Sequence, residues 1–264
     1  MSTRNEIVTG FYDQSDEENR LVKSRHGQLE YAVTTEYIRR YAAYKAKIIE
    51  IGAGTGRYSV ALARKGFDVT AVELVESNFL KLCENGRGLN NLKPFQGDGT
   101  DLSRFGDGGF DLTLVFGPMY HLYDPADVEK AIDEAIRVTK PGGTLFFAFI
   151  SVFGIMSANY FDGNWAFGQN ENFTKGNAVR HFKEQLFTGY DVAEFERLFD
   201  KKPVTHLATA GVDWILESLE QRQDFNISDD DFKAFTEWYL AFCEKRELLG
   251  HTNHLLYICR RNAE

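Results

Sequence analysis

The chain has 264 residues, of which 43% are hydrophobic, so it is long enough to bury about 70–75% of the surface of its unfolded form. Its formal net charge of −9 argues against a polynucleotide partner, because non-specific affinity for nucleic acid comes mainly from Lys and Arg. The 3 cysteines are scattered without disulfide or metal-ligand spacing, which predicts a reducing compartment and no metal.

Two further features argue against export and against a membrane span. The amino-terminal residues carry charges of both signs and lack the apolar core of a signal peptide. The most apolar stretch, Leu145–Met156, is shorter than the roughly 20 residues that cross a bilayer. We therefore expect a cytoplasmic protein without membrane contact.

The first part of the chain, residues 1–46, predicts helices over 17–25 and 28–40 that are separated at Gly27. We expect this segment, with Phe11 and Tyr12 beside it, to act as a lid over the site, although plain packing helices are the alternative.

The second part, residues 47–150, alternates short β-branched or aromatic runs with helical patterns, which is typical of a parallel sheet covered by helices on both faces. A helix is expected to begin after Asp124, with Pro125 as its first residue. Strands are expected at 48–51, 68–74, 92–96, 110–116 and 144–150.

The third part, residues 151–190, mixes Gly and Asn with aromatic residues and shows no clean period, which predicts an inserted cap. Its aromatic side chains form either a satellite core or the wall of a substrate pocket. They are Phe153, Tyr160, Phe161, Trp165, Phe167, Phe173 and Phe182. The fourth part, 191–264, returns to the main fold with strands in 203–216 and 254–261 and a helix around 231–249.

A glycine-rich stretch, "EIGAGTGRY" from Glu50 to Tyr58, follows the first predicted strand and opens a helix. Such a turn costs backbone entropy, so a ligand is a better explanation than a plain turn. A dinucleotide fingerprint, G-x-G-x-x-G, would need glycine at position 57, where this chain has Arg57. Glu50 would also repel a pyrophosphate, whereas it suits the ammonium and sulfonium of S-adenosylmethionine.

Two more acids follow the next two predicted strands. Glu73 ends the second strand about 20 residues past the glycines, where a carboxylate can accept hydrogen bonds from both ribose hydroxyls. Asp98 follows the third strand, where it can accept from the exocyclic amine of adenine. The series predicts a nucleoside site.

Four stretches together, "IIEIGAGTGRYSVALARKGFDVTAVEL", "GDGTDL", "FDLTLVFGPMYHL" and "EAIRVTKPGGTLFFAF", resemble the class I S-adenosylmethionine-dependent methyltransferases, and most closely the small-molecule type with Gly-Pro-x-Tyr-His-Leu after the fourth strand. The resemblance implies a doubly wound, Rossmann-like α/β fold with a seven-stranded, mostly parallel sheet and an antiparallel last strand. It implies S-adenosyl-L-methionine as cofactor. The residues assigned to the cofactor are Glu50, Gly52, Ala53, Gly54, Thr55, Gly56, Glu73, Leu74, Asp98, Gly99, Thr100, Phe116 and Gly117.

Methyl transfer from a sulfonium is an in-line displacement, so holding the reacting groups in line can supply much of the catalysis. Tyr120 and His121 are the candidate catalytic residues, to orient or deprotonate the nucleophile; packing is their alternative role. His181, His206, His251 and His254 are expected to be structural or solvated.

The expected partner is a small-molecule acceptor, and the expected oligomeric state is a monomer or homodimer. A nucleic-acid or protein methyltransferase stays open, although Gly117 and Met119 depart from the Asn/Asp-Pro-Pro-Tyr/Phe motif of base methylation. A non-catalytic S-adenosylmethionine sensor stays open too, and a nicotinamide oxidoreductase is the weakest alternative.

Overall fold

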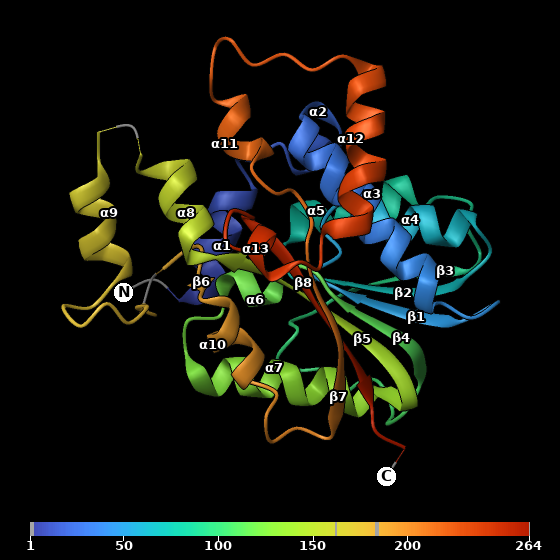
Figure 1. Ribbon diagram of the computed structural model, residues 1–264. Helices are drawn as coiled ribbons and strands as arrows, with labels where there is room; N and C mark the ends of the chain where they lie inside the picture. Colours follow the sequence, from blue (N-terminus) through green and yellow to red (C-terminus); the bar gives the residue numbers. More distant parts are fainter. Residues whose placement is uncertain (1–2, 162, 183–184, 264) are drawn as a thin grey trace.

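The computed structural model describes residues 3–161, 163–182 and 185–263. One sheet with the strand order β3-β2-β1-β4-β5-β8-β7 forms the centre of the molecule (Figure 1). Strands β1 to β5 run parallel, and β8 runs antiparallel to both β5 and β7. The strands are β1 (Lys47–Ile51), β2 (Asp68–Glu73), β3 (Leu92–Gln96), β4 (Phe110–Val115), β5 (Thr139–Ser151), β7 (Val204–Gly211) and β8 (His254–Arg261), with a two-residue β6 (Gly189–Tyr190) paired to the end of β5.

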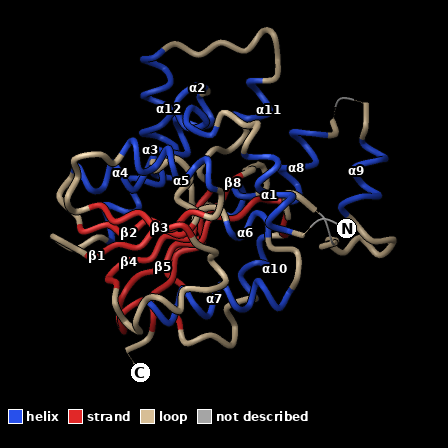
Figure 2. Tube along the Cα trace, turned by 180° about the vertical axis from the view of Figure 1, so that it is seen from behind, coloured by secondary structure: helices blue, strands red, loops and turns tan. Residues whose placement is uncertain are grey.

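Helices cover both faces of the sheet, as Figures 1 and 2 both show. One face carries α3 (Arg25–Tyr41), α4 (Arg57–Arg64), α5 (Glu76–Asn85) and α12 (Asp229–Phe242), and the opposite face carries α7 (Pro125–Val138) and α10 (Val192–Arg197). Helices α8 (Val152–Asn159) and α9 (Trp165–Asn172) project to one side. The remaining short elements are α1 (Arg4–Tyr12), the 3₁₀ turn η1 (Glu17–Asn19), α2 (Arg20–Lys23), α6 (Pro118–His121), α11 (Leu216–Glu220) and α13 (Arg246–Leu249).

The alternation of side chains along the buried strands explains why the sheet needs two helical layers. Ile48 belongs to the hydrophobic cluster under α3 and α4, while its neighbours Ile49 and Ile51 belong to the cluster under α7. Successive side chains of a strand point to opposite faces, so a strand whose side chains are buried on both faces, as in β1 from Ile48 to Ile51, must be covered twice. The local sequence of β1 thus requires the doubly wound arrangement.

The predicted fold class is confirmed: seven main strands form a mostly parallel sheet, and the last strand is antiparallel. The predicted start of the 125–138 helix also holds, because Asp124 caps it and Pro125 is its first residue. β6 is an additional short strand.

The prediction of a helix break at Gly27 is wrong. The break falls at Ser24, whose side chain accepts a hydrogen bond from the backbone N–H of Gly27 and so caps α3. Gly27 lies inside α3, where a Cβ would collide with the carbonyl oxygen of Arg20 in α2. Its small size therefore serves the close packing of α2 on α3 rather than a hinge.

The amino-terminal helix α1 was not predicted. The strand expected within 203–216 ends at Gly211, and α11 begins at Leu216. Within the described residues, no helix is long and apolar enough to cross a membrane.

Candidate active site

A cavity of about 430 Å³ opens at the carboxyl edge of the parallel strands. Its lining includes Gly52 after β1, Leu74 after β2, Asp98 after β3 and Phe116 after β4. Because β1 lies between β2 and β4, this is the point where the chain switches from one half of the sheet to the other, and open α/β sheets bind ligands there.

The glycine turn forms the part of the cavity next to β1. Gly52, Gly54 and Gly56 have positive φ angles of 81°, 54° and 90°, which side chains rarely adopt. A Cβ at Gly52 would also collide with the carbonyl oxygen of Phe116, so only glycine lets this turn lie against the end of β4. Gly54 lines the cavity, whereas Gly56 faces Leu82 of α5.

The carboxylate of Glu73 holds the glycine turn in place. It accepts hydrogen bonds from the backbone N–H groups of Gly54 at 2.7 Å and Val75 at 2.9 Å. Burial raises the pKa of Glu73, and these two hydrogen bonds oppose the shift. Each carboxylate oxygen keeps a further lone pair for a ligand, because one such oxygen can accept two hydrogen bonds.

Asp98 connects the cavity to the amino-terminal helix. It accepts hydrogen bonds at 2.9 Å from the backbone N–H and the hydroxyl of Thr100, and it forms an ion pair with Arg4 of α1. Burial alone would raise the pKa of Asp98, but the Thr100 hydrogen bonds and the Arg4 charge outweigh it and lower the pKa. Helix α1 is thus fastened directly to a predicted cofactor residue.

Glu50 differs from the sequence-based expectation. Its side chain is 1% exposed and accepts a hydrogen bond from the Ser59 hydroxyl. Burial raises the pKa of Glu50 to about 8 even though this hydrogen bond lowers it. The carboxyl is therefore mostly neutral near pH 7, and the predicted repulsion of a pyrophosphate by its charge is wrong; the misplaced third glycine still argues against a dinucleotide.

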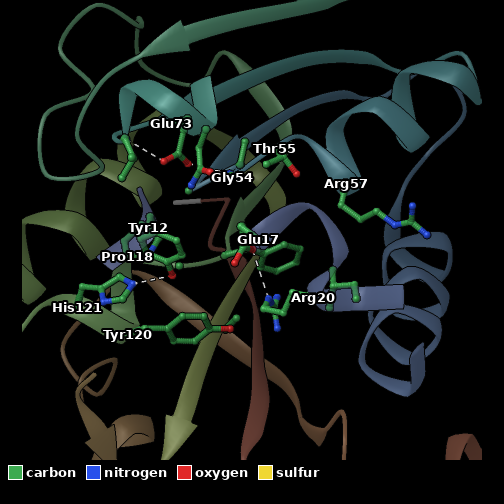
Figure 3. Close-up of a pocket in the computed structure, with 18 of the residues that line it drawn as sticks. Tyr12, Glu17, Arg20, Gly54, Thr55, Arg57, Glu73, Pro118, Tyr120 and His121 are labelled. Atoms are coloured by element: carbon green, nitrogen blue, oxygen red, sulfur yellow. Dashed lines mark hydrogen bonds and ion pairs between the residues drawn. The ribbon is translucent and has the colours of Figure 1, made fainter. Parts of the chain in front are cut away.

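His121 is held in one tautomer by two contacts, of which Figure 3 shows the one to Tyr12. Its Nδ1 lies 2.6 Å from the carbonyl oxygen of Leu186, which can only accept, so Nδ1 carries the proton. Its Nε2 lies 3.1 Å from the Tyr12 hydroxyl, which therefore donates to it. Burial lowers the pKa of His121 to about 4, so the imidazole is neutral near pH 7.

Further charged side chains line the cavity and form what we call the charged wall: Glu17, which lies against Gly54 of the glycine turn, Arg20, Glu30, Glu217 and His254. Arg20 pairs with Glu30 at 2.7 Å and with Glu17 at 3.3 Å. His254 pairs at 2.7 Å with Asp213, which is fully buried behind the wall. The sequence analysis missed these groups, and it expected His254 to be structural or solvated.

The structure brings most of the predicted residues to one cavity. Those that line it are Glu50, Gly52, Ala53, Gly54, Thr55, Glu73, Leu74, Asp98, Gly99, Phe116, Gly117, Tyr120 and His121, while Gly56 and Thr100 do not. None of the seven aromatic side chains named for the inserted segment lines it, and Phe153, Phe161, Trp165 and Phe167 are exposed. Their prediction as a pocket wall is wrong; Phe187 lines the cavity instead.

The fold and the cavity define a Rossmann-like α/β protein with its ligand space at the switch point of the sheet. More particularly, residues 48–143 match the family model described as a methyltransferase domain. This part of the chain is therefore similar to a methyltransferase domain.

Curated relatives match about half of the chain. A demethylmenaquinone methyltransferase of Clavibacter sepedonicus is 34% identical over 143 residues, which cover 52% of this chain and 53% of that protein. A ubiquinone biosynthesis O-methyltransferase of Acinetobacter baylyi is 29% identical over 122 residues, which cover 43% of this chain and 50% of that protein. The chain therefore spans about half the length of the curated relatives it matches.

Among solved structures, a protein of Thermotoga maritima described as an S-adenosylmethionine-dependent methyltransferase, possible histamine N-methyltransferase, superposes with a TM-score of 0.61. The match covers 98% of this chain and 100% of that one at 16% identity, which shows the fold alone.

Proposed function

We propose that this protein transfers a methyl group from S-adenosyl-L-methionine to a small-molecule acceptor. The observation that best supports this proposal is that one cavity contains the positive-φ glycine turn, the carboxylates of Glu73 and Asp98, and the Tyr12–His121 pair. The matching relatives, by their names, methylate menaquinone and ubiquinone precursors, which supports a small acceptor here too.

The residues of the nucleoside side fit the adenosyl part of this cofactor. Glu73 keeps free lone pairs for ribose hydroxyls, and the backbone at Gly52 and Gly54 comes close to the cavity because no Cβ intervenes. Asp98 would accept from the adenine amine. The bound cofactor supplies an electrophilic methyl group on its sulfonium.

The segment after β4 provides the acceptor side. The Gly-Pro-x-Tyr-His-Leu sequence places His121 and Tyr120 at the cavity, with Gly117 at a φ of 126°. A neutral imidazole with a pKa of about 4 is a weak proton acceptor at pH 7, since an efficient base has a pKa near the working pH. We therefore assign His121 the orienting role: it holds the Tyr12 hydroxyl, whose oxygen faces the nucleophile, and positioning carries the reaction.

The amino-terminal segment completes the site as a lid. Besides Arg4 and Tyr12, Phe11 packs edge-on against Phe187 with ring centroids 5.2 Å apart, so α1 spans the cavity from the adenine side to the acceptor side. We propose that residues 1–46 close over the 47–150 cofactor-binding part, with 151–190 and 191–264 completing the acceptor side.

Calorimetry with S-adenosylhomocysteine, followed by a turnover assay, tests the proposal. We expect saturable binding of the product but not of nicotinamide dinucleotides, and release of S-adenosylhomocysteine with small molecules but not with tRNA or DNA. If S-adenosylhomocysteine does not bind, the proposal that S-adenosyl-L-methionine is the cofactor is wrong. Binding without turnover across a broad small-molecule set would favour the sensor function, and turnover on tRNA or DNA the nucleic-acid methyltransferase.

A further inference from the structure

The charged wall is assembled from two distant regions of the chain, residues 17–30 and residues 217–254. Glu17 and Arg20 come from η1 and α2, Glu30 from α3, Glu217 from α11, and His254 from the start of β8. Figure 3 shows Glu17 and Arg20 pointing toward one another beside Tyr12 and Tyr120. Because Glu17 also lies against Gly54, the wall extends from the glycine turn to the acceptor side of the cavity.

The wall and the Asp213 carboxyl behind it contain more acidic than basic side chains. Arg20 is shared between Glu17 and Glu30, and it donates to both oxygens of Glu30 at 2.7 and 3.0 Å. His254 is shared between Asp213 and Glu217, whose ligand atoms all lie within 4.8 Å of one another. Four carboxyl groups thus share two cations.

The pKa values of two of these carboxyl groups reflect the shortage of cations around them. Burial raises the pKa of Glu17 and the pKa of Asp213, because a buried carboxylate without a full counter-charge is costly. Burial would lower the pKa of His254, but Glu30 and Asp213 outweigh it and raise the pKa to about 9. The imidazole is then protonated near pH 7, so the wall is an ion-pair cluster with more carboxyl groups than cations.

An independent feature beside this wall indicates a ligand. Tyr58 is 6% exposed and lines the cavity; its buried hydroxyl has Thr34 as a polar neighbour but makes no hydrogen bond of normal geometry among the described residues. Its ring packs on Phe116 with centroids 5.2 Å apart, and Tyr120 lines the same space. An unpartnered buried hydroxyl costs free energy unless a ligand supplies its hydrogen bond, and aromatic faces attract ammonium groups.

We propose that the acceptor is a small molecule that carries a protonated amine, and that its ammonium binds at the charged wall beside Tyr58 and Tyr120. The ammonium donates to the free lone pairs of Glu17 and Glu217 and to the hydroxyl oxygen of Tyr58. This inference rests on the proposed function and adds the substrate class. The inference is argued from the charged side chains of the wall and not from the similarity to the Thermotoga protein, because that similarity shows only the fold.

Matched sets of compounds test the amine directly. Each set has one shared ring and a side chain that ends in an amine, an alcohol or a carboxylate: tyramine, tyrosol and 4-hydroxyphenylacetate, or histamine, imidazole-ethanol and imidazole-acetate. Binding to the full chain saturated with S-adenosylhomocysteine is measured by calorimetry. In a set that binds, we expect the amine to bind about tenfold or more tightly than its neutral and anionic partners, because hydrogen bonds between charged groups are the stronger ones.

The variant Glu217→Gln keeps the acceptor for Asn253 but removes the charge. It should lose most of the amine preference, whereas Glu237→Gln, an exposed position on α12, should keep it. Equal or tighter binding of the alcohol or carboxylate, failure of every amine to bind, or an unchanged preference in Glu217→Gln would overturn the proposal. If S-adenosylhomocysteine itself does not bind, the proposed function has failed instead.

Discussion

The environment of His121 predicts a specific dependence of stability on pH. The side chain is 7% exposed, its Nδ1–H donates to Leu186, and its Nε2 accepts from Tyr12. A second proton on Nε2 would abolish the Tyr12 hydrogen bond and leave a buried cation. The folded protein therefore resists protonation of His121, and replacement by Gln removes the titrating group.

The magnitude follows from the two pKa values. The pKa of His121 falls from 6.5 to about 4 on folding. Between pH 6.5 and 4 the unfolded chain binds a proton at His121 that the folded chain does not bind. The contribution of neutral His121 to the free energy of unfolding is therefore complete above pH 6.5 and is lost as pH falls through 4. The full loss is about 3 kcal/mol, since one pKa unit is about 1.4 kcal/mol, and about 2 kcal/mol of it falls between roughly pH 7.5 and 5.

The assay is urea unfolding of the wild type and of His121→Gln across that interval. As pH falls from roughly 7.5 to 5, the free energy of unfolding of the wild type should decrease by about 2 kcal/mol more than that of His121→Gln. His251→Gln, which removes an exposed imidazole, controls for the loss of a histidine as such. If the wild-type and His121→Gln curves run parallel, the burial and tautomer assigned to His121 are incorrect.

Three further outcomes are expected. Glu73→Ala should weaken S-adenosylhomocysteine binding by about tenfold or more in calorimetry, because hydrogen bonds to charged groups contribute about 1.5–3 kcal/mol. Asp98→Ala should weaken this binding less strongly. Unchanged affinity in a folded Glu73→Ala protein would exclude the ribose role. Tyr12→Phe should lower turnover by about 10²-fold or less at constant cofactor affinity, as expected for lost positioning, and full activity would remove Tyr12 from the site. Amide hydrogen exchange in Arg4–Tyr12 should slow on cofactor binding; unaltered exchange would count against a lid.

The sheet and the nucleoside side of the cavity could be predicted from the sequence. Strand periodicity, the glycine turn after β1 and the acids after β2 and β3 are local signals, because each reflects the conformation or burial of a few consecutive residues. In a parallel sheet the strand ends meet at one edge, so Gly52, Glu73 and Asp98 had to lie close together once the strand order was known. Class and cofactor follow from such local patterns.

Most of the acceptor side could not be predicted from the sequence. Arg20, Glu30 and His254 come from α2, α3 and β8, and no spacing in the chain relates His254 to residues more than 200 positions earlier. The protonation states were equally hidden: His121 and His254 are the same residue type, yet burial lowers one pKa to about 4 and carboxylates raise the other to about 9. Electrostatic fields depend on distances through space, which residue spacing does not record.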